Sequence, residues 1–340
     1  MSAPVAAPPG GFTPLDRLTL AYVTVPTLAL ALSFRDGAIP GWPFVLLAQV
    51  LTVACVLIAP RARGAGPVGR VVGDLYPLLL LPALYGEIGI FTLHRGVVHD
   101  SLIQALELRL FGTQVSVDWI RAMPHAALSW LLHASYLAYY PILAAPPLVL
   151  WATGRRDPAR ATVLAVMATF YLHYAVFIFF PVAGPRYFFP LADNAATAVW
   201  PARFAQQMLN GADSWGAAFP SSHVAAAVVA TGMAWTASRA LGLALLPATV
   251  GLTLGVVYGQ FHYGVDAVTG LAAGLAILGG FAWWGRRGSG SREPAAKLAR
   301  DIARPGPATA AEPGVAAGRS GTPGARPPSG VSACADARPP

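Results

Sequence analysis

The sequence carries little charge. Only 11% of its 340 residues are Asp, Glu, Lys or Arg, and 55% are hydrophobic. A soluble domain carries roughly 25% charged residues, so this composition excludes an ordinary soluble fold. Long apolar stretches that are almost free of charge predict an integral membrane protein instead.

Lysine and cysteine are also scarce. Lys297 is the single lysine, so arginines at the ends of apolar stretches and in the C-terminal region provide the net charge of +8. Lipid head groups and the positive-inside rule account for such arginines, and we therefore expect no nucleic-acid partner. The preference for arginine is typical of a GC-rich genome, which suggests a bacterial plasma membrane. Cys55 in an apolar stretch and Cys334 in a polar one are candidates neither for a disulfide nor for a metal site.

The apolar stretches lack the ten-residue alternation of a membrane β-barrel, and backbone in lipid must satisfy its own hydrogen bonds. The predicted fold class is therefore all-α: a polytopic membrane bundle of about eight transmembrane helices with a surface amphipathic helix. A span needs roughly 20 residues, because a helix rises about 1.5 Å per residue. The predicted spans are residues 18–34, 42–59, 71–93, 126–151, 161–180, 217–237, 241–257 and 267–284.

The segment between the third and fourth spans breaks the apolar pattern. Leucines recur at every fourth position from 102 to 110 beside polar residues. This spacing predicts an amphipathic helix on the membrane surface, capped by Asp100 or Ser101 and stopped by Gly112.

Composition divides the chain into three parts. Residues 1–17 and 288–340 are rich in Ala, Pro and Gly, and we predict that both are disordered. Residues 18–287 form the predicted transmembrane domain. No basic segment precedes the first span, so a cleaved signal peptide is not expected.

The arginines indicate the orientation of the bundle. With eight spans, the short arginine-bearing loops all fall on one side, which the positive-inside rule makes cytoplasmic. Both chain ends are then cytoplasmic, and the opposite ends of the spans are extracytoplasmic. These loop arginines are Arg61, Arg63, Arg70, Arg155, Arg156, Arg160, Arg239, Arg286 and Arg287.

A histidine-bearing motif stands at each end of one predicted helical hairpin. Residues 219–223 read Phe-Pro-Ser-Ser-His, and residues 262–266 read His-Tyr-Gly-Val-Asp. The chain between them crosses the membrane and returns. We therefore expect His223 and His262 on the same side, where two histidines and an aspartate suggest chemistry rather than packing.

His262 and Asp266 are four residues apart, so at the start of a helix they share one face. The carboxylate could then accept the ring N–H of the histidine, fix its tautomer and raise its basicity, as in a catalytic triad. The alternative is an ordinary helix cap with a polar neighbour.

His223 follows two serines and a proline at the start of an apolar helix, where free N–H groups form an anion site. A histidine there could give a proton to the bound anion, or it could be a surface residue on a capped helix. Arg186, just past the fifth span, suits bidentate phosphate binding or head-group anchoring.

Together, Arg186, Pro220-Ser221-Ser222-His223 and His262-x-x-x-Asp266 resemble the three signature motifs of the type-2 phosphatidic acid phosphatase superfamily. The resemblance is strongest over residues 180–274. Further upstream, residues 99–112 and 133–141 are similar to the branch named for inositol phosphorylceramide synthase.

The resemblance implies a role for each motif residue. His262 would attack phosphorus and form a phosphohistidine, Asp266 would orient and stabilise it, and His223 would protonate the leaving oxygen. Because arginine and helix N-termini can neutralise phosphate, neither a metal nor a cofactor is implied. The phosphoryl oxygens would be held by Arg186, Ser221 and Ser222.

Two positions differ from the usual motifs. The first motif usually opens with a basic residue seven before the arginine, where this chain has Phe179. The third usually carries an arginine six before the nucleophilic histidine, where this chain has Val256, and the synthase-like branch also dispenses with it. Fewer fixed cations leave phosphate binding weaker or shared. Candidates to share it are Arg95, Tyr187 and Gln260.

His133 and His173 lie within predicted spans, where ionisable residues are functional candidates. Each is either a neutral histidine bonded to a neighbouring helix or a head-group contact from the bundle interior.

The resulting hypothesis is a membrane enzyme that hydrolyses or transfers a phosphate ester of a lipid at the extracytoplasmic face. The acceptor is water or an alcohol such as a polyol. The hypothesis from another class is a non-catalytic membrane protein that binds or transports lipid. Intact His223, His262 and Asp266 argue against it, and the sequence shows no inverted repeats of the kind that favour a transporter.

Overall fold

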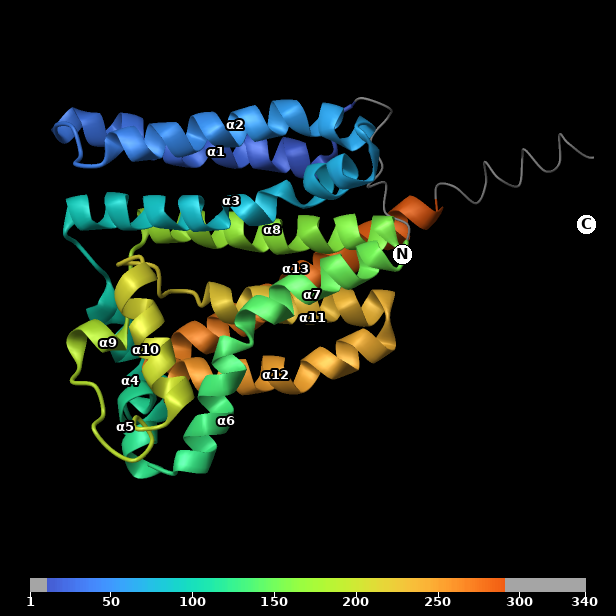
Figure 1. The fold of residues 1–340 in the computed structure, drawn as a ribbon. Helices are drawn as coiled ribbons and strands as arrows, with labels where there is room; N and C mark the ends of the chain where they lie inside the picture. Colours follow the sequence, from blue (N-terminus) through green and yellow to red (C-terminus); the bar gives the residue numbers. More distant parts are fainter. Residues whose placement is uncertain (1–10, 291–340) are drawn as a thin grey trace, which may run out of the picture. The chain divides into compact units, whose positions relative to one another are not determined.

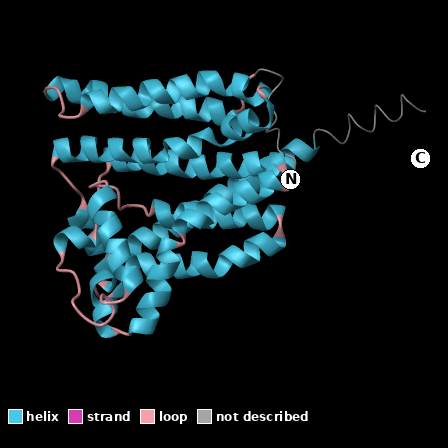
Figure 2. Ribbon diagram, viewed as in Figure 1, coloured by secondary structure: helices cyan, strands magenta, loops and turns pink. Residues whose placement is uncertain are grey.

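The computed structural model describes residues 11–290, which contain helices and no strand (Figures 1 and 2). One isolated bridge joins Val182 and Ala217. The elements are α1 (Pro14–Ser33), η1 (Phe34–Asp36), α2 (Trp42–Gly64), α3 (Gly66–Arg95), α4 (Asp100–Phe111), α5 (Val115–Ala122), α6 (Ala126–Leu137), α7 (Tyr139–Ala152), α8 (Arg156–Phe179), α9 (Pro185–Phe188), α10 (Trp200–Ala212), α11 (Ser222–Ala237), α12 (Arg239–Tyr258) and α13 (Gly264–Gly290).

The predicted all-α polytopic membrane bundle is confirmed. Within residues 11–290, six helices are long and apolar enough to cross a membrane, namely α1, α2, α3, α8, α12 and α13. Two further predicted spans correspond to shorter helices, because α7 has 14 residues and α11 has 16. The count of eight spans therefore stays a prediction.

The prediction of the fourth span is wrong, because residues 126–151 form two helices rather than one. The helices α6 and α7 meet at Ala138. Pro141 has no N–H to donate to the carbonyl of Leu137, so the helical ladder breaks there. The break turns α6 away from α7 toward the end of the bundle that holds α4, α5, α9 and α10 (Figure 1).

The predicted amphipathic helix is α4, and Gly112 stops it as expected. Gly112 has a φ of +74° and donates its N–H to the Leu108 carbonyl. The predicted cap is wrong. His99 occupies the cap position, and the Asp100 carboxylate instead binds the backbone of Ala183 and Gly184.

The predicted limits of the disordered segments need a correction at each end of the chain. Helix α1 begins at Pro14, so residues 14–17 of the predicted disordered segment are helical. Thr13 and Asp16 form a capping box there, each side chain accepting the other's backbone N–H. At the other end α13 runs to Gly290, past the predicted limit at 287. Residues 11–13 precede α1 without regular structure, and the other residues of the two predicted disordered segments, 1–10 and 291–340, lie outside the described residues.

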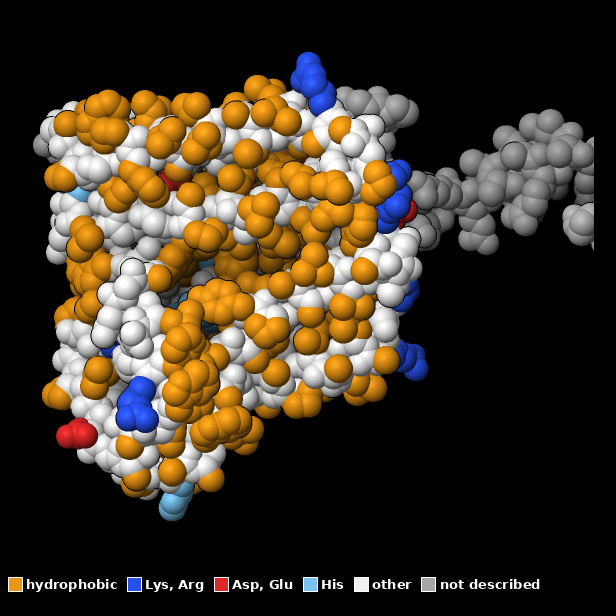
Figure 3. All heavy atoms as spheres, in the orientation of Figure 1, with side chains coloured by type: hydrophobic (Ala, Val, Ile, Leu, Met, Phe, Trp, Pro, Cys, Tyr) orange, Lys and Arg blue, Asp and Glu red, His pale blue; other side chains and the backbone are white. Residues whose placement is uncertain are grey.

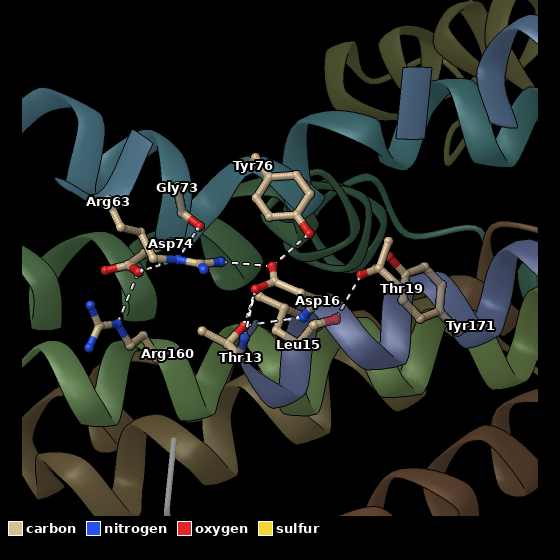
Figure 4. A network of polar contacts seen from close by, with 10 residues as sticks. All are labelled: Thr13, Leu15, Asp16, Thr19, Arg63, Gly73, Asp74, Tyr76, Arg160 and Tyr171. Atoms are coloured by element: carbon tan, nitrogen blue, oxygen red, sulfur yellow. Dashed lines mark hydrogen bonds and ion pairs between the residues drawn. The ribbon is translucent and has the colours of Figure 1, made fainter. Parts of the chain in front are cut away.

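The described loop arginines Arg63 and Arg160 lie at one end of the bundle, where a polar network joins α1, α2, α3 and α8 (Figure 4). Arg63 donates to Asp16 at 2.7 Å, and Arg160 pairs with Asp74 at 3.0 Å. Both carboxylates are fully buried. We call these four residues the arginine-end network. On the face drawn in Figure 3, hydrophobic side chains cover the long helices and most Lys and Arg side chains lie near this end.

Helix α8 runs from this end to the opposite one and is the centre of the packing. It contacts α1, α3, α7 and α11, and most of its side chains are buried. Helices α11 and α13 also pack closely. Gly270 on α13 lies so near the Ser221 carbonyl oxygen that a Cβ there would collide with it. These contacts bring the end of α8 and the starts of α11 and α13 together.

Candidate active site

Two backbone bonds bring the segment after α8 beside the segment before α11. Val182 donates its N–H to the Gly216 carbonyl at 3.0 Å, and Ala218 donates to the Val182 carbonyl at 2.8 Å. The first of the three predicted motifs therefore lies against the second. Gly184 has a φ of +102°, so this position strongly favours glycine.

Asp100 fixes this arrangement from a third direction. Its carboxylate, which is buried, accepts the backbone N–H groups of Ala183 and Gly184, both at 2.8 Å. The same carboxylate accepts the hydroxyl of Tyr263 at 3.0 Å. Tyr263 directly follows His262, so a single residue of α4 positions both the segment leading to Arg186 and the residue next to His262.

His262 has one ring nitrogen fixed as a donor and the other left as an acceptor. Nδ1 lies 2.9 Å from the Ala218 carbonyl and 3.4 Å from the Asp266 carboxylate. Both partners only accept, so Nδ1 carries the hydrogen and Nε2 carries a lone pair. The predicted pairing of His262 with Asp266 therefore occurs, with the Ala218 carbonyl as a closer partner.

Asp266 is buried at the first turn of α13. One of its oxygens accepts the Tyr263 N–H at 2.8 Å and lies near His262, while the other has no hydrogen-bond partner. The Asp266 carbonyl accepts the N–H of Ser221 at 3.0 Å. The start of α13 is thereby tied to the start of α11.

His223 faces His262, as the hairpin argument predicted. The Nδ1 atom of His223 lies 3.4 Å from Nε2 of His262, and the ring centroids are 5.4 Å apart. Because His262 Nε2 is an acceptor, His223 Nδ1 is the donor of this contact. Tyr136 and Tyr139 pack beside the His223 ring, with centroids 5.7 and 4.5 Å away.

Arg186 on α9 lines the same cavity as the two histidines, but its guanidinium is already paired. It donates to Asn210 at 2.7 Å and to Asp213 at 3.4 Å. Asp213 also accepts hydroxyls from Tyr85 and Tyr187. Burial, with a smaller contribution from Asp213, raises the pKa of Tyr187 to about 12, so its phenol keeps the proton it donates.

The two serines are placed less directly. Ser221 caps α11 by accepting the Val224 N–H, and both Ser221 and Ser222 are buried. Neither lines the cavity described next, so the structure brings Arg186, His223 and His262 together there without the two serines.

The cavity between Arg186 and the two histidines is small. It offers about 20 Å³, roughly the room of one or two water molecules. Tyr85, Tyr136, Asp213 and Phe261 complete much of its wall. A group larger than one or two water molecules would therefore need the cavity to widen.

The residues proposed to share phosphate binding lie elsewhere or act indirectly. Arg95 donates to the Ile178 carbonyl at 2.6 Å, and Gln260 bonds the backbone of residues 190 and 192. Tyr187 bonds Asp213. His173 donates toward the Thr169 carbonyl and lines neither this cavity nor the second one described below, whereas His133 lines the second.

Asp100, Asp213 and Tyr85 are the site residues that sequence reasoning missed. Asp100 appeared to be a helix cap because it opens an amphipathic helix. Asp213 had only one signal, a charge in the loop that follows Arg186. Tyr85 lies inside an apolar stretch that gives no sign of its contact with Asp213, 128 residues away.

A comparison with protein-family models matches residues 103–280, just over half of the chain, to the PAP2 superfamily. The match covers all three predicted motifs. Comparisons with curated proteins and with solved structures gave no match.

Proposed function

Because the chain belongs to the PAP2 superfamily of membrane lipid phosphatases and phosphotransferases, we propose that it cleaves or transfers a phosphate ester of a lipid through a phosphohistidine at His262. The observation that carries the proposal is the histidine pair. One ring has its Nδ1–H fixed and its Nε2 free, and a donor nitrogen of the other lies 3.4 Å from that Nε2.

In the first step, Nε2 of His262 attacks phosphorus and the bond to the ester oxygen breaks. The leaving oxygen takes a proton from His223 in its doubly protonated form, which becomes a neutral ring, and departs as an alcohol. Positive charge builds on the His262 ring, where Asp266 and the Ala218 carbonyl stabilise its Nδ1–H. Arg186 exchanges Asp213 for the phosphoryl oxygens, so charge on phosphate replaces charge on a carboxylate.

In the second step, the oxygen of water or of an alcohol attacks phosphorus and the bond to Nε2 breaks. The proton of the attacking hydroxyl passes to His223, which is again ready to protonate a leaving group. Water gives free phosphate, and an alcohol gives a new phosphate ester. Positioning and charge neutralisation are supplied by side chains on α9, α11 and α13.

The proposals for the transferred group and for the membrane face rest on the sequence. Residues 99–112 and 133–141 are similar to the inositol phosphorylceramide synthase branch, which favours transfer of a phospho-polyol head group. The histidine pair lies at the end of α8 remote from Arg160. With the arginine end cytoplasmic by the positive-inside rule, the site is extracytoplasmic, in a bacterial plasma membrane.

The test is turnover by the purified full-length protein in detergent. Phosphatidic acid and phosphatidylinositol are supplied with EDTA present, and free phosphate and new lipids are followed. We expect turnover without added metal, and inhibition by vanadate, which resembles the five-coordinate phosphorus of the transition state. Binding of these lipids without any turnover would favour the non-catalytic lipid-binding alternative.

A further inference from the structure

A second cavity lies beside the first and has no role in the chemistry described so far. It offers about 80 Å³, about four times the room of the first. Residues from α5, α6, α10, the loop before α10 and the turn after α12 line it. Six of them are Ile120, His133, Ala192, Gln206, Gly259 and Gln260.

Residues of the same two segments, α10 and the turn between α12 and α13, line both cavities. On α10, Ala202 and Gln206 face the second cavity, and Leu209 and Asp213 at its end face the first. In the turn between α12 and α13, Gly259 and Gln260 line the second, and the next two residues line the first. Gln206 and Leu209 are three residues apart and thus neighbours on one helical face. The cavities are therefore adjacent along α10.

The ring of Phe261 stands between them. Its centroid lies 4.4 Å from that of Tyr136, which lines the first cavity. It lies 5.7 Å from that of His133, which lines the second. Phe261 therefore contacts a lining residue of each cavity, and it directly precedes His262 in the chain.

Two residues that line the second cavity, Gln206 and His133, carry hydrogen-bond acceptors. The side-chain oxygen of Gln206 is buried and has no hydrogen-bond partner. Nδ1 of His133 lies 2.9 Å from the Ser129 carbonyl, which can only accept, so this nitrogen carries the hydrogen and Nε2 is left as an acceptor. A buried acceptor without a donor is costly, so the Gln206 oxygen favours a ligand that brings a hydroxyl donor.

The wall opposite α10 is held in place. The side chain of Gln260 accepts the Ala192 N–H at 2.8 Å and contacts the Pro190 carbonyl at 3.4 Å. Gln260 has a φ of +61°, the only positive value at a non-glycine residue within 11–290. A strained backbone of this kind persists when its surroundings fix it, and it is frequent at functional sites.

We propose that the second cavity binds a small polyol, which acts as the acceptor that competes with water for the phosphohistidine. This inference rests on the proposed function. One hydroxyl of the polyol would pass the edge of Phe261, its oxygen would bond to phosphorus, and the bond from phosphorus to His262 Nε2 would break. The hydroxyl proton would pass to His223, and other hydroxyls would donate to Gln206 and His133.

The experiment measures the ratio of transfer to hydrolysis in the full-length protein. Labelled phosphatidic acid is supplied with glycerol or, at the same molarity, with 1-propanol, and phosphate esters and free phosphate are separated. A single hydroxyl cannot satisfy both acceptors while also reacting, so we expect glycerol to give about tenfold more transfer than 1-propanol. Gln206→Leu should lower the glycerol ratio about tenfold, and Ala202→Leu, which fills the cavity, should also lower it.

Gln207→Leu is the matched control, because Gln207 is the exposed neighbour of Gln206 on the same helix. It should leave the ratio unchanged. Equal ratios in the wild type and in whichever of the two cavity variants folds would overturn the inference. So would hydrolysis by the wild type without any glycerol phosphate, although the proposed function would stand. Absence of both products would contradict the proposed function itself.

Discussion

Both ends of the bundle contain arginine–aspartate pairs, but the pairs differ in what surrounds them. In the arginine-end network, Asp16 and Asp74 are fully buried, and Arg63 and Arg160 each reach a carboxylate (Figure 4). At the other end, Arg186 pairs with Asp213 beside a cavity that also holds two facing histidines. Asp213 keeps 17% of its side-chain surface exposed, whereas Asp16 keeps none.

This difference separates a structural pair from one suited to function. Asp16 is surrounded by fixed donors from the backbone, Tyr76 and Arg63, so nothing is gained by opening its ion pair. Asp213 offers Arg186 a carboxylate that a phosphate can replace, and two tyrosines remain to bond the released carboxylate. On the proposed function, the same two residue types close one end of the bundle and leave the other able to exchange a carboxylate for a phosphate.

The largest effect should come from the histidine pair itself. His262→Ala removes the proposed nucleophile and should lower turnover of phosphatidic acid by about a thousandfold or more. Release of free phosphate is the measurement, and thermal unfolding in detergent verifies that the variant folds. Substantial activity in a folded His262→Ala protein would mean that another residue attacks phosphorus.

At the arginine end, a substitution should act on stability. Arg63→Ala leaves the buried Asp16 carboxylate without its cation, and we expect the free energy of unfolding to fall by about 3–5 kcal/mol. An SDS titration of helicity measures it. Turnover per folded molecule should stay at the wild-type value, and a large change in it would show that the two ends are coupled.

Arg186→Ala is the matched change at the other end. Here we expect the main loss in turnover and the smaller loss in stability. Turnover should fall about a hundredfold, the usual effect of removing one donor that stabilises a transition state. Its unfolding free energy should fall less than that of Arg63→Ala, because Tyr85 and Tyr187 still donate to Asp213. A loss of stability equal to that of Arg63→Ala, with activity retained, would remove the distinction between the ends.

A smaller effect is expected at Asp100, which positions the site without lining the cavity. In Asp100→Asn one of the two carboxylate acceptors becomes an amide donor, so the N–H of Ala183 or Gly184 loses its partner. We expect kcat to fall about tenfold with little change in KM. Steady-state kinetics decide the point. Unchanged kcat would contradict a positioning role.

The smallest effect should come from Asp213→Asn. The neutral amide competes less well for Arg186 than a carboxylate does, so a lipid phosphate should displace it more easily. We expect KM for phosphatidic acid to fall a few-fold at low salt and the difference to shrink as salt rises. A rise in KM would show that Asp213 helps to bind substrate instead of competing with it.

The sequence was sufficient to predict features that follow from apolar periodicity or from the number of membrane crossings. Two apolar stretches joined by a short turn must return to the same side, which placed His223 opposite His262 without knowledge of any contact. The stop of α4 at Gly112 followed from local backbone chemistry in the same way. The contact between His262 and Asp266 was likewise anticipated from their spacing, although His262 lies two residues before α13 begins and not on its face.

It was insufficient where a residue's partner is distant in the chain. Asp100 bonds backbone groups 83 and 84 residues away, and no local pattern distinguishes that use from a helix cap. The segment between α8 and α11 carries Trp200, Phe204 and Met208 at helical spacing, but it was interpreted as a polar loop, so α10, and with it the position of Asp213 and Gln206, was not predicted. The break between α6 and α7 was missed because apolar composition continues through Pro141.

The most direct test of the account is to trap the covalent intermediate. Full-length protein is mixed with radiolabelled phosphatidic acid, quenched with alkali within the first turnover, digested and sequenced by mass spectrometry. The account predicts an acid-labile, alkali-stable phosphoryl group on His262, absent in His262→Ala and persisting longer when the second step is slow. Steady turnover with a phosphoryl group on another residue, or with none on the protein, would contradict it.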